Sequence, residues 1–224
     1  NRFPNTVLGV IVAKGIDNTG KNDEVTRLLQ EVEAETIKRF DGKPISEDPT
    51  IQSWRQAYRS FGARDYCASI EALVKRMVKG KGVWQINKLV DLYNYISLKY
   101  VLPVGGEDIN KIEGNLILKE AEGDERFIAL GSEENDPPLS GEPIYRDDHD
   151  VICRRWNWRE AEKTKLTEET RDAILVIEGL QPEERARIES ALQEFATLIE
   201  KYLGGKLTTY QMNIDNRATT GILL

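Results

Sequence analysis

The chain has 224 residues and a formal net charge of −7, and its 40% hydrophobic and 31% charged residues suit a globular protein with one sizeable core. The acidic balance argues against nucleic-acid binding over the whole surface, because neutralising phosphates requires clustered Lys and Arg. His149 is the single histidine, which excludes sites that need two histidines. We therefore expect no metal and no cofactor.

Hydropathy and cysteine content indicate the compartment. No run approaches the roughly 18 apolar residues of a membrane span, and residues 1–15 lack a signal-peptide cleavage pattern. Cys67 and Cys153 are too few for a disulfide framework, so we expect two reduced core thiols. These features predict a soluble, cytoplasmic protein without a membrane partner.

Strands and helices are predicted from the period of the apolar residues, from capping residues and from Gly and Pro. The predicted strands are 6–14, 115–121, 126–130, 143–146, 150–155 and 173–179. The predicted helices are 22–40, 51–58, 66–78, a helix that carries Asn87, Asp91 and Asn94, and 182–202. A turn at residues 122–125 favours a hairpin between the second and third strands. This order indicates an α/β class fold in the wider sense, an α+β mixed sheet with helices.

One domain covering 1–224 is expected, because neither a linker nor an internal repeat interrupts the chain. Within it we distinguish a strand–helix lobe (1–82), a central region (83–180) and a C-terminal helix with its tail (181–224). The tail 206–224 is compatible with a closing strand, an arm to a partner subunit or disorder. The C-terminal helix or the tail is therefore a candidate homodimer contact.

Charge is strongly segregated along the chain. Residues 55–82 contain seven basic residues and two acids, and residues 154–165 contain five basic residues and two acids. Residues 132–150 run the other way, with seven acids and one arginine. Such a dipolar surface can dock one anionic ligand on one face, although charge runs are also common on plain solvated surface.

Two polar motifs are candidates for a ligand site. Asn87, Asp91 and Asn94 lie at spacings of four and three, so they share one face of their helix, where packing alone would favour apolar groups. The second motif, residues 153–159, places Trp156 and Asn157 among three arginines, which is a costly composition to expose. It suits either a pocket wall or a structural corner whose arginines pair with the preceding acidic loop.

The order of residues in 87–125 resembles the B3/B4 editing domain of the phenylalanyl-tRNA synthetase beta subunit. The shared positions are Asn87, Val90, Asp91, Asn94, Tyr95, Pro103, Asp108, Lys111, Ile112, Gly114, Asp124 and Glu125. The resemblance continues more weakly upstream at Ser69, Leu73 and Arg76, and downstream through 147–179. Gly105 stands where the family has its editing-pocket histidine, and a corner of Arg and Trp replaces a Gly-rich loop.

The resemblance implies a tRNA-binding, trans-editing hydrolase that cleaves the ester of a mischarged aminoacyl-tRNA, with the 3′ end of the tRNA as its partner. A synthetase is excluded, because the chain is too short for the catalytic core. The candidate catalytic residues are Asn87, Asp91, Asn94 and Asp108. The candidate substrate- and tRNA-binding residues are Ser69, Arg76, Gly105, Gly106, Arg154, Arg155, Trp156 and Asn157.

Two other functions remain open at this point. A non-catalytic module could retain the fold and bind tRNA, an amino acid or a protein partner, since the family histidine is missing. A small-molecule hydrolase acting on an ester or amide is the third alternative. Steep weakening by salt is expected of tRNA binding and not of amino-acid binding.

Overall fold

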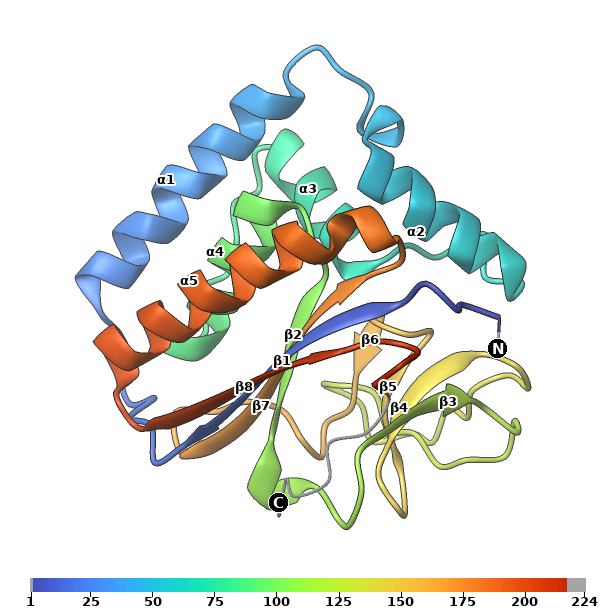
Figure 1. Cartoon of the computed structure of the whole chain (residues 1–224). Coiled ribbons are helices and arrows are strands. Elements are labelled where there is room, and N and C mark those ends of the chain that lie inside the picture. Colours follow the sequence, from blue (N-terminus) through green and yellow to red (C-terminus); the bar gives the residue numbers. More distant parts are fainter. Residues whose placement is uncertain (1, 217–224) are drawn as a thin grey trace.

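The computed structural model describes residues 2–216 (Figure 1). Two four-stranded sheets form the frame, and every strand pairing within them is antiparallel. The helices cover one face of the first sheet, and the second sheet lies beyond its other face (Figure 1). The α+β fold class predicted from the sequence is confirmed. No helix within residues 2–216 is both long enough and apolar enough to cross a membrane.

The first sheet has the order β2-β7-β1-β8. Its strands are β1 (Val7–Lys14), β2 (Val104–Asp108), β7 (Asp172–Gly179) and β8 (Lys206–Met212). Strands from all three predicted segments of the chain therefore share one sheet. The start of the tail is a closing strand, since β8 pairs with β1 from Leu8↔Met212 to Lys14↔Lys206. The end of the tail, 217–224, lies outside the described residues.

Five α-helices within residues 2–216 pack on this sheet or on one another. They are α1 (Asp23–Phe40), α2 (Pro49–Ser60), α3 (Ser69–Val78), α4 (Lys88–Tyr100) and α5 (Arg185–Leu203). The α1 helix begins where predicted, because the Asn22 side chain accepts hydrogen bonds from the N–H groups of Glu24 and Val25. Apolar side chains of α1, α4 and α5 join those of β1 and β7 in the main core.

The apolar stripe of α5 is buried within the chain. Ile188 and Phe195 are fully buried, and α5 contacts β1, β7, β8 and α4. Gly9 and Gly179 allow this close approach, because a Cβ on Gly179 would lie 2.6 Å from Ile188 Cδ1. A homodimer contact at the helix or the tail stays a prediction, and this stripe is not available for it.

The second sheet has the order β3-β4-β5-β6. Its strands are β3 (Ile117–Glu120), β4 (Pro143–Arg146), β5 (Val151–Arg154) and β6 (Arg159–Glu160). The hairpin predicted at residues 122–125 is wrong, because β3 pairs with β4 instead, and residues 126–130 form only isolated bridges. The Glu125 carboxylate closes the turn by accepting hydrogen bonds from the N–H groups of Glu122 and Gly123, both at 2.8 Å.

Candidate ligand cavity

A cavity of about 210 Å³ lies between the two sheets, on the side of β2 and β7 that faces away from the helices. Alternation along β7 sends Leu175 and Ile177 into the helix-side core, so Ile174, Val176 and Glu178 face the other way. The pairings Gly105↔Val176 and Glu107↔Ile174 place Gly105 and Glu107 on the same face. The floor of the cavity thus carries a carboxylate towards each end and a glycine between them.

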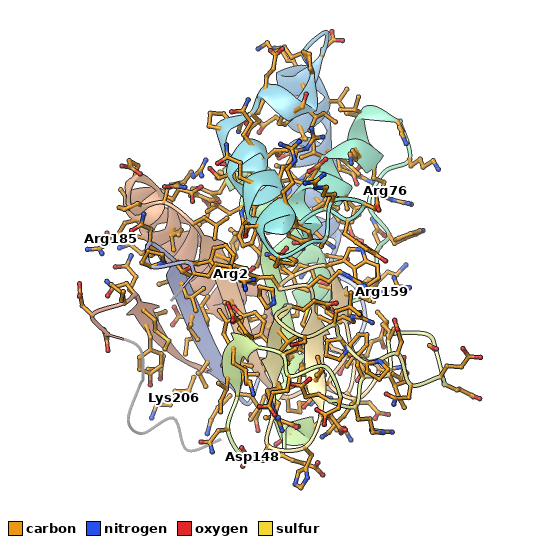
Figure 2. All side chains as sticks on the ribbon, turned by 90° about the vertical axis from the view of Figure 1, so that its right-hand side faces the viewer. Arg2, Arg76, Asp148, Arg159, Arg185 and Lys206 are labelled. Carbon is orange, nitrogen blue, oxygen red and sulfur yellow. The ribbon has the colours of Figure 1, made fainter. Side chains whose placement is uncertain are left out.

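The opposite wall comes from the second sheet. Tyr145, Cys153 and Glu160 occupy paired positions on β4, β5 and β6, and all three line the cavity. Arg159, on β6, also lines the cavity, and its exposed side chain lies on the same side of the molecule as Arg76 and opposite Arg185 (Figure 2). Most of the lining surface is apolar, with a few polar groups that converge from both sheets. Small-ligand sites in proteins commonly have this composition.

The two glycines of β2, Gly105 and Gly106, have different surroundings, which give different reasons for the lack of a side chain. A Cβ on Gly106 would lie 2.4 Å from Leu175 Cδ2 and 3.2 Å from the Ile174 carbonyl oxygen, so no side chain fits there. A Cβ on Gly105 would meet only the Glu160 carboxylate, at 3.6 Å. Gly106 is therefore required by packing, whereas Gly105 leaves room in the cavity.

Glu178 lines one end of the cavity and is 3% exposed. Its Oε1 accepts hydrogen bonds from the Tyr145 hydroxyl at 2.5 Å and from Trp156 Nε1 at 3.0 Å, and its Oε2 accepts one from Asn157 Nδ2. Burial raises the pKa of Glu178 to about 7, and these donors oppose that rise. Glu178 is thus a buried carboxylate that titrates near neutral pH.

The hydrogen bonds from Trp156 and Asn157 to Glu178 also anchor an unusual stretch of backbone. Arg155 and Trp156 have positive φ angles of 49° and 67°, which non-glycine residues seldom adopt. The Trp156 ring is held edge-on against Phe3 (ring centroids 4.7 Å apart) and Trp54 (5.1 Å). This packing, together with Glu178, turns Asn157 towards the cavity.

Glu107 and Glu160 form a second, less satisfied carboxylate group. The Thr164 hydroxyl donates to Glu107 Oε2, and no side chain within residues 2–216 donates a hydrogen bond to Glu160. Burial and the neighbouring Glu160 raise the pKa of Glu107 well above its ordinary value, and burial raises that of Glu160 to about 7. Because two close carboxylates in a largely apolar cavity resist ionising together, the pair retains a proton at neutral pH.

A second pocket, which we call the basic pocket, lies beside the cavity, and its volume is about 200 Å³. Residues of α2, α3 and the segment between them line it: Arg55, Tyr58, Arg59, Arg64, Asp65, Tyr66, Cys67, Glu71 and Lys75. Glu71 neutralises part of this charge through Arg55 and Lys75, each at 2.7 Å. Arg59 and Arg64 form no ion pair with a residue of the 2–216 range.

The basic pocket and the cavity share a wall. The Tyr58 hydroxyl lies 2.7 Å from the Arg155 carbonyl oxygen and 3.2 Å from Asn157 Oδ1. The Tyr66 ring packs edge-on against Trp158, with ring centroids 4.8 Å apart. Tyr58 and Tyr66 line the basic pocket, and Asn157 and Trp158 line the cavity. A ligand with an anionic part and an uncharged part could therefore occupy both.

Five of the twelve predicted site residues line the cavity: Ser69, Gly105, Gly106, Trp156 and Asn157. Two of these residues are in direct contact: Asn157 Oδ1 accepts a hydrogen bond from the Ser69 N–H at 3.2 Å. The Ser69 Oγ is buried, and no hydrogen-bond partner for it lies in the described part of the chain. That hydroxyl is free to donate to a ligand.

The four predicted catalytic residues lie away from the cavity lining. Asn87 is the N-cap of α4, accepting from the Val90 N–H at 3.0 Å and donating to the Leu166 carbonyl at 3.2 Å. The Asp91 carboxylate accepts from the Ile86 N–H at 3.1 Å, and burial raises its pKa. The remaining two are Asn94, which is half-buried on α4, and Asp108, which accepts a hydrogen bond from the Thr170 hydroxyl at 2.7 Å.

The three predicted arginines also lie outside the cavity lining. Arg76 stacks on Trp84, 3.5 Å from the ring centroid. Arg154 is 2% exposed and pairs with Glu142 at 3.0 Å and with Asp136 at 2.6 Å. Arg155 lies over Tyr66, 3.8 Å from its ring centroid. The 153–159 motif therefore combines the two alternatives given above: Arg154 pairs with the preceding acidic loop, as in a structural corner, and Trp156 and Asn157 form a pocket wall.

The sequence reasoning missed Glu107, Glu160 and Glu178. Each lies in a strand, Glu107 in β2, Glu160 in β6 and Glu178 in β7, where Glu178 interrupts an apolar run. A carboxylate in such a run is costly to bury unless it has partners or a function. That cost is the signal that could have identified Glu178.

An acidic cluster outside the cavity surrounds the side-chain amine of Lys163. Ligand atoms of Glu113, Asp147 and Asp150 lie within 4.8 Å of one another. Lys163 Nζ lies 2.8 Å from Glu113 and from Asp147, and 3.1 Å from Asp150. The Lys163 ammonium thus occupies the position that a metal ion would take, and its charge helps to hold the pKa of Asp147 down at about 2.

Comparison with known proteins agrees with the sequence pattern. The phenylalanine–tRNA ligase beta subunit of Aquifex aeolicus is 33% identical over 119 residues, covering 51% of this chain and 12% of that subunit. The Vibrio parahaemolyticus subunit is 29% identical over 94 residues, covering 42% of this chain and 12% of its own length. The crystal structure of an N-terminal fragment of the phenylalanyl-tRNA synthetase beta-subunit from Pyrococcus horikoshii is 19% identical with a TM-score of 0.46, covering 55% of this chain and 44% of that one.

These relatives are much longer than this chain, which aligns with about an eighth of each ligase subunit. The match to the family described as B3/4 domain extends over residues 53–204, and so includes α3, α4, α5 and every residue that lines the cavity. The chain belongs to the B3/4 domain family.

Proposed function

We propose that this domain binds the 3′ end of an aminoacyl-tRNA and hydrolyses the ester between the amino acid and the terminal ribose. One observation carries the proposal: the basic pocket and the apolar cavity share a wall. An aminoacyl-tRNA end needs such a pair of sites, one for phosphate and one for the acyl group. The names of the matched relatives, which are tRNA ligases, agree with this assignment.

The basic pocket is assigned to the phosphate of the terminal nucleotide. Arg59 and Arg64 form no ion pair in the described range, although Asp65 also lines the pocket, and a guanidinium can donate two parallel hydrogen bonds to phosphate. Arg76 lies on the same helix as Lys75, which lines the pocket. The tRNA would therefore approach over α2 and α3, across the basic segment 55–82.

The cavity is assigned to the acyl group. Its volume of about 210 Å³ is below the range of roughly 300–1,000 Å³ typical of drug-sized ligands, so it suits one amino-acid side chain. Gly105 enlarges the space, and the apolar side chains around it exclude water. Of the predicted binding residues, Ser69, Gly105, Gly106, Trp156 and Asn157 contact the ligand in this proposal.

The chemistry is assigned to Glu178 and Ser69. A carboxylate whose pKa is about 7 is well matched to accept a proton at neutral pH. Water attacks the ester carbonyl carbon, its proton passes to Glu178, and the proton returns to the ribose oxygen when the acyl C–O bond breaks. The unpartnered Ser69 hydroxyl donates to the developing oxyanion. Asn87, Asp91 and Asp108 hold α4 and β2 in place and act only through the fold.

Hydrolysis of a panel of mischarged aminoacyl-tRNAs tests the proposal. We expect release of one class of amino acid, and a loss of about 10²–10⁴ in the single-turnover rate in Glu178→Gln. Glu133→Gln, which removes an exposed carboxylate, is the matched control and should retain the wild-type rate. Equal rates in Glu178→Gln and wild type would remove Glu178 from the mechanism, and no release from any tRNA would refute the hydrolase.

The saturation of Glu178 favours one alternative, a module that binds the same tRNA end without cleaving it. Three donors already hold this carboxylate, which restricts its access to water. Retention of aminoacyl-tRNA without hydrolysis would support that function. In either case the logarithm of the binding constant should fall with the logarithm of salt, and Arg59→Gln with Arg64→Gln should reduce that slope by up to about 1.4, at about 0.7 per phosphate contact.

A further inference from the structure

The Glu107 and Glu160 pair has no part in the hydrolysis proposed above, and it is placed in the same cavity. Glu107 is 8% exposed, and its one side-chain donor within residues 2–216, the Thr164 hydroxyl, reaches only Oε2. Oε1 of Glu107 and the whole Glu160 carboxylate therefore have unused acceptor capacity. Glu178, by contrast, already accepts three hydrogen bonds.

Charge around this pair is unbalanced. Within residues 2–216 no lysine or arginine forms an ion pair with either carboxylate. Arg159 also lines the cavity, but its side chain is exposed, and burial is what raises the pKa of Glu160. The other titratable groups that face the pair are the Tyr93 hydroxyl and the Cys153 thiol. Burial and the nearby carboxylates raise the pKa of the Tyr93 hydroxyl and of the Cys153 thiol, so these two groups stay neutral and supply no counter-charge.

The pair is also separated from the proposed site of bond cleavage. Ile174, the β7 partner of Glu107, precedes Glu178 by four residues, which corresponds to about 13 Å along the strand. Gly105 lies between the two ends, beside the Glu160 carboxylate. An acyl group whose ester lies near Glu178 and Asn157 would therefore extend its side chain past Gly105 towards Glu160 and Glu107.

We propose that Glu107 and Glu160 bind the ammonium group at the end of the ligand's side chain, so that the cavity selects basic aliphatic acyl groups. A cation between the two carboxylates would supply the missing counter-charge and take up their free lone pairs. An apolar side chain of equal length would leave Oε1 of Glu107 and the Glu160 carboxylate without a partner, and a site that contains unpaired polar groups rejects such a ligand. This inference rests on the proposed function for its orientation of the ligand.

Isothermal titration calorimetry with two amides of equal shape provides the test. L-ornithinamide ends in an ammonium where L-norleucinamide has a methyl group, and neither carries an ester that can be cleaved. We expect ornithinamide to bind at least about tenfold more tightly to wild type. Its binding at pH 7 should release protons, measured in two buffers of different ionisation enthalpy, because a nearby cation lowers the pKa of the carboxylate pair.

Glu160→Gln should bring the two affinities within about twofold and abolish the proton release. Glu107→Gln is a second variant, in case the first is unstable, and Glu133→Gln should behave as wild type; melting curves check that each is folded. Equal affinities in wild type, preference for norleucinamide, no ornithinamide binding at millimolar concentration, or unchanged selectivity in both variants would overturn the inference.

The two proposals fail in different ways. Ornithinamide selectivity without deacylation of any tRNA would refute the hydrolase and leave the ammonium site standing. Deacylation of apolar aminoacyl-tRNAs by a protein that shows no ornithinamide preference would support the hydrolase and refute the ammonium site. Deacylation confined to basic aminoacyl groups would support both.

Discussion

Gly105 and Gly106 are neighbours in β2, and alanine at the two positions should have opposite effects. At Gly106 the new methyl would lie 2.4 Å from Leu175 Cδ2 and 3.3 Å from Leu166 Cδ1. Leu175 is fully buried, and the Ile174 carbonyl, 3.2 Å away, blocks the other direction. At Gly105 the methyl would point into the cavity and meet only the Glu160 carboxylate at 3.6 Å.

The expected magnitudes follow from these contacts. Overpacking of a core costs about 1–3 kcal/mol, and replacing a strand glycine with alanine recovers about 0.5–1 kcal/mol of backbone entropy. Gly106→Ala should therefore lower the free energy of unfolding by about 0.5–2 kcal/mol, with a melting temperature lower by roughly 2–6 °C. Gly105→Ala should be as stable as wild type or more stable by up to about 1 kcal/mol.

Urea unfolding and thermal melting measure both variants, and ligand binding distinguishes them further. Gly105→Ala should fold normally and bind acyl ligands weakly, because the methyl occupies the space between the floor of the cavity and Glu160. Gly106→Ala should keep whatever affinity its folded fraction allows. Equal melting temperatures in the two variants, or a stable Gly106→Ala, would refute the account of why β2 carries two glycines.

Three further predictions concern stability. Because the pKa of Glu178 in the folded protein is raised to about 7, this residue stabilises the folded state below pH 4.5, and the stabilisation is lost as pH rises to 7. The difference in unfolding free energy between Glu178→Gln and wild type, measured by urea titrations, should therefore shift by up to about 3 kcal/mol over that range. A difference that does not change with pH would contradict the raised pKa. Arg154→Ala leaves the buried Glu142 carboxylate with only the longer contact to Arg155, at 3.7 Å, and should cost about 3–5 kcal/mol, seen as a lower urea midpoint; a loss below 1 kcal/mol would argue against a buried pair. Asn87→Ala removes the α4 cap and should cost about 0.5–2 kcal/mol without changing acyl selectivity in the folded protein; lost selectivity would return Asn87 to the site.

Local signals in the sequence were sufficient for most of the individual elements. Each of these signals depends on residues close together in the chain. They are the β-branched run of β1, the Asn22 cap and apolar period of α1, and the proline before and the glycines after α5. The resemblance in 87–125 was sufficient for the family, now supported by the match over 53–204. The hairpin at 122–125 was wrong because a side chain, Glu125, closes that turn without a strand pairing behind it.

The polar face of α4 shows why local spacing misleads about function. Asn87 is the N-cap that precedes α4, and Asp91 lies in the first turn of the helix; each accepts a hydrogen bond from a backbone N–H group near the start of α4, a need common to helix ends. Spacing alone does not distinguish a cap from a ligand contact, because both require a polar side chain in the same place. Only the partners of each atom distinguish the two.

The sequence by itself determined the fold class, the family and the identity of several cavity residues, because these depend on local periodicity and on an ordered run of residues. Only the tertiary structure decided that Glu107, Glu160 and Glu178 meet in one cavity. Their strands are distant in the chain, and the order β2-β7-β1-β8, with the second sheet beyond it, brings them together. Long-range pairing also sets their burial, and burial sets the pKa values on which the proposed chemistry depends.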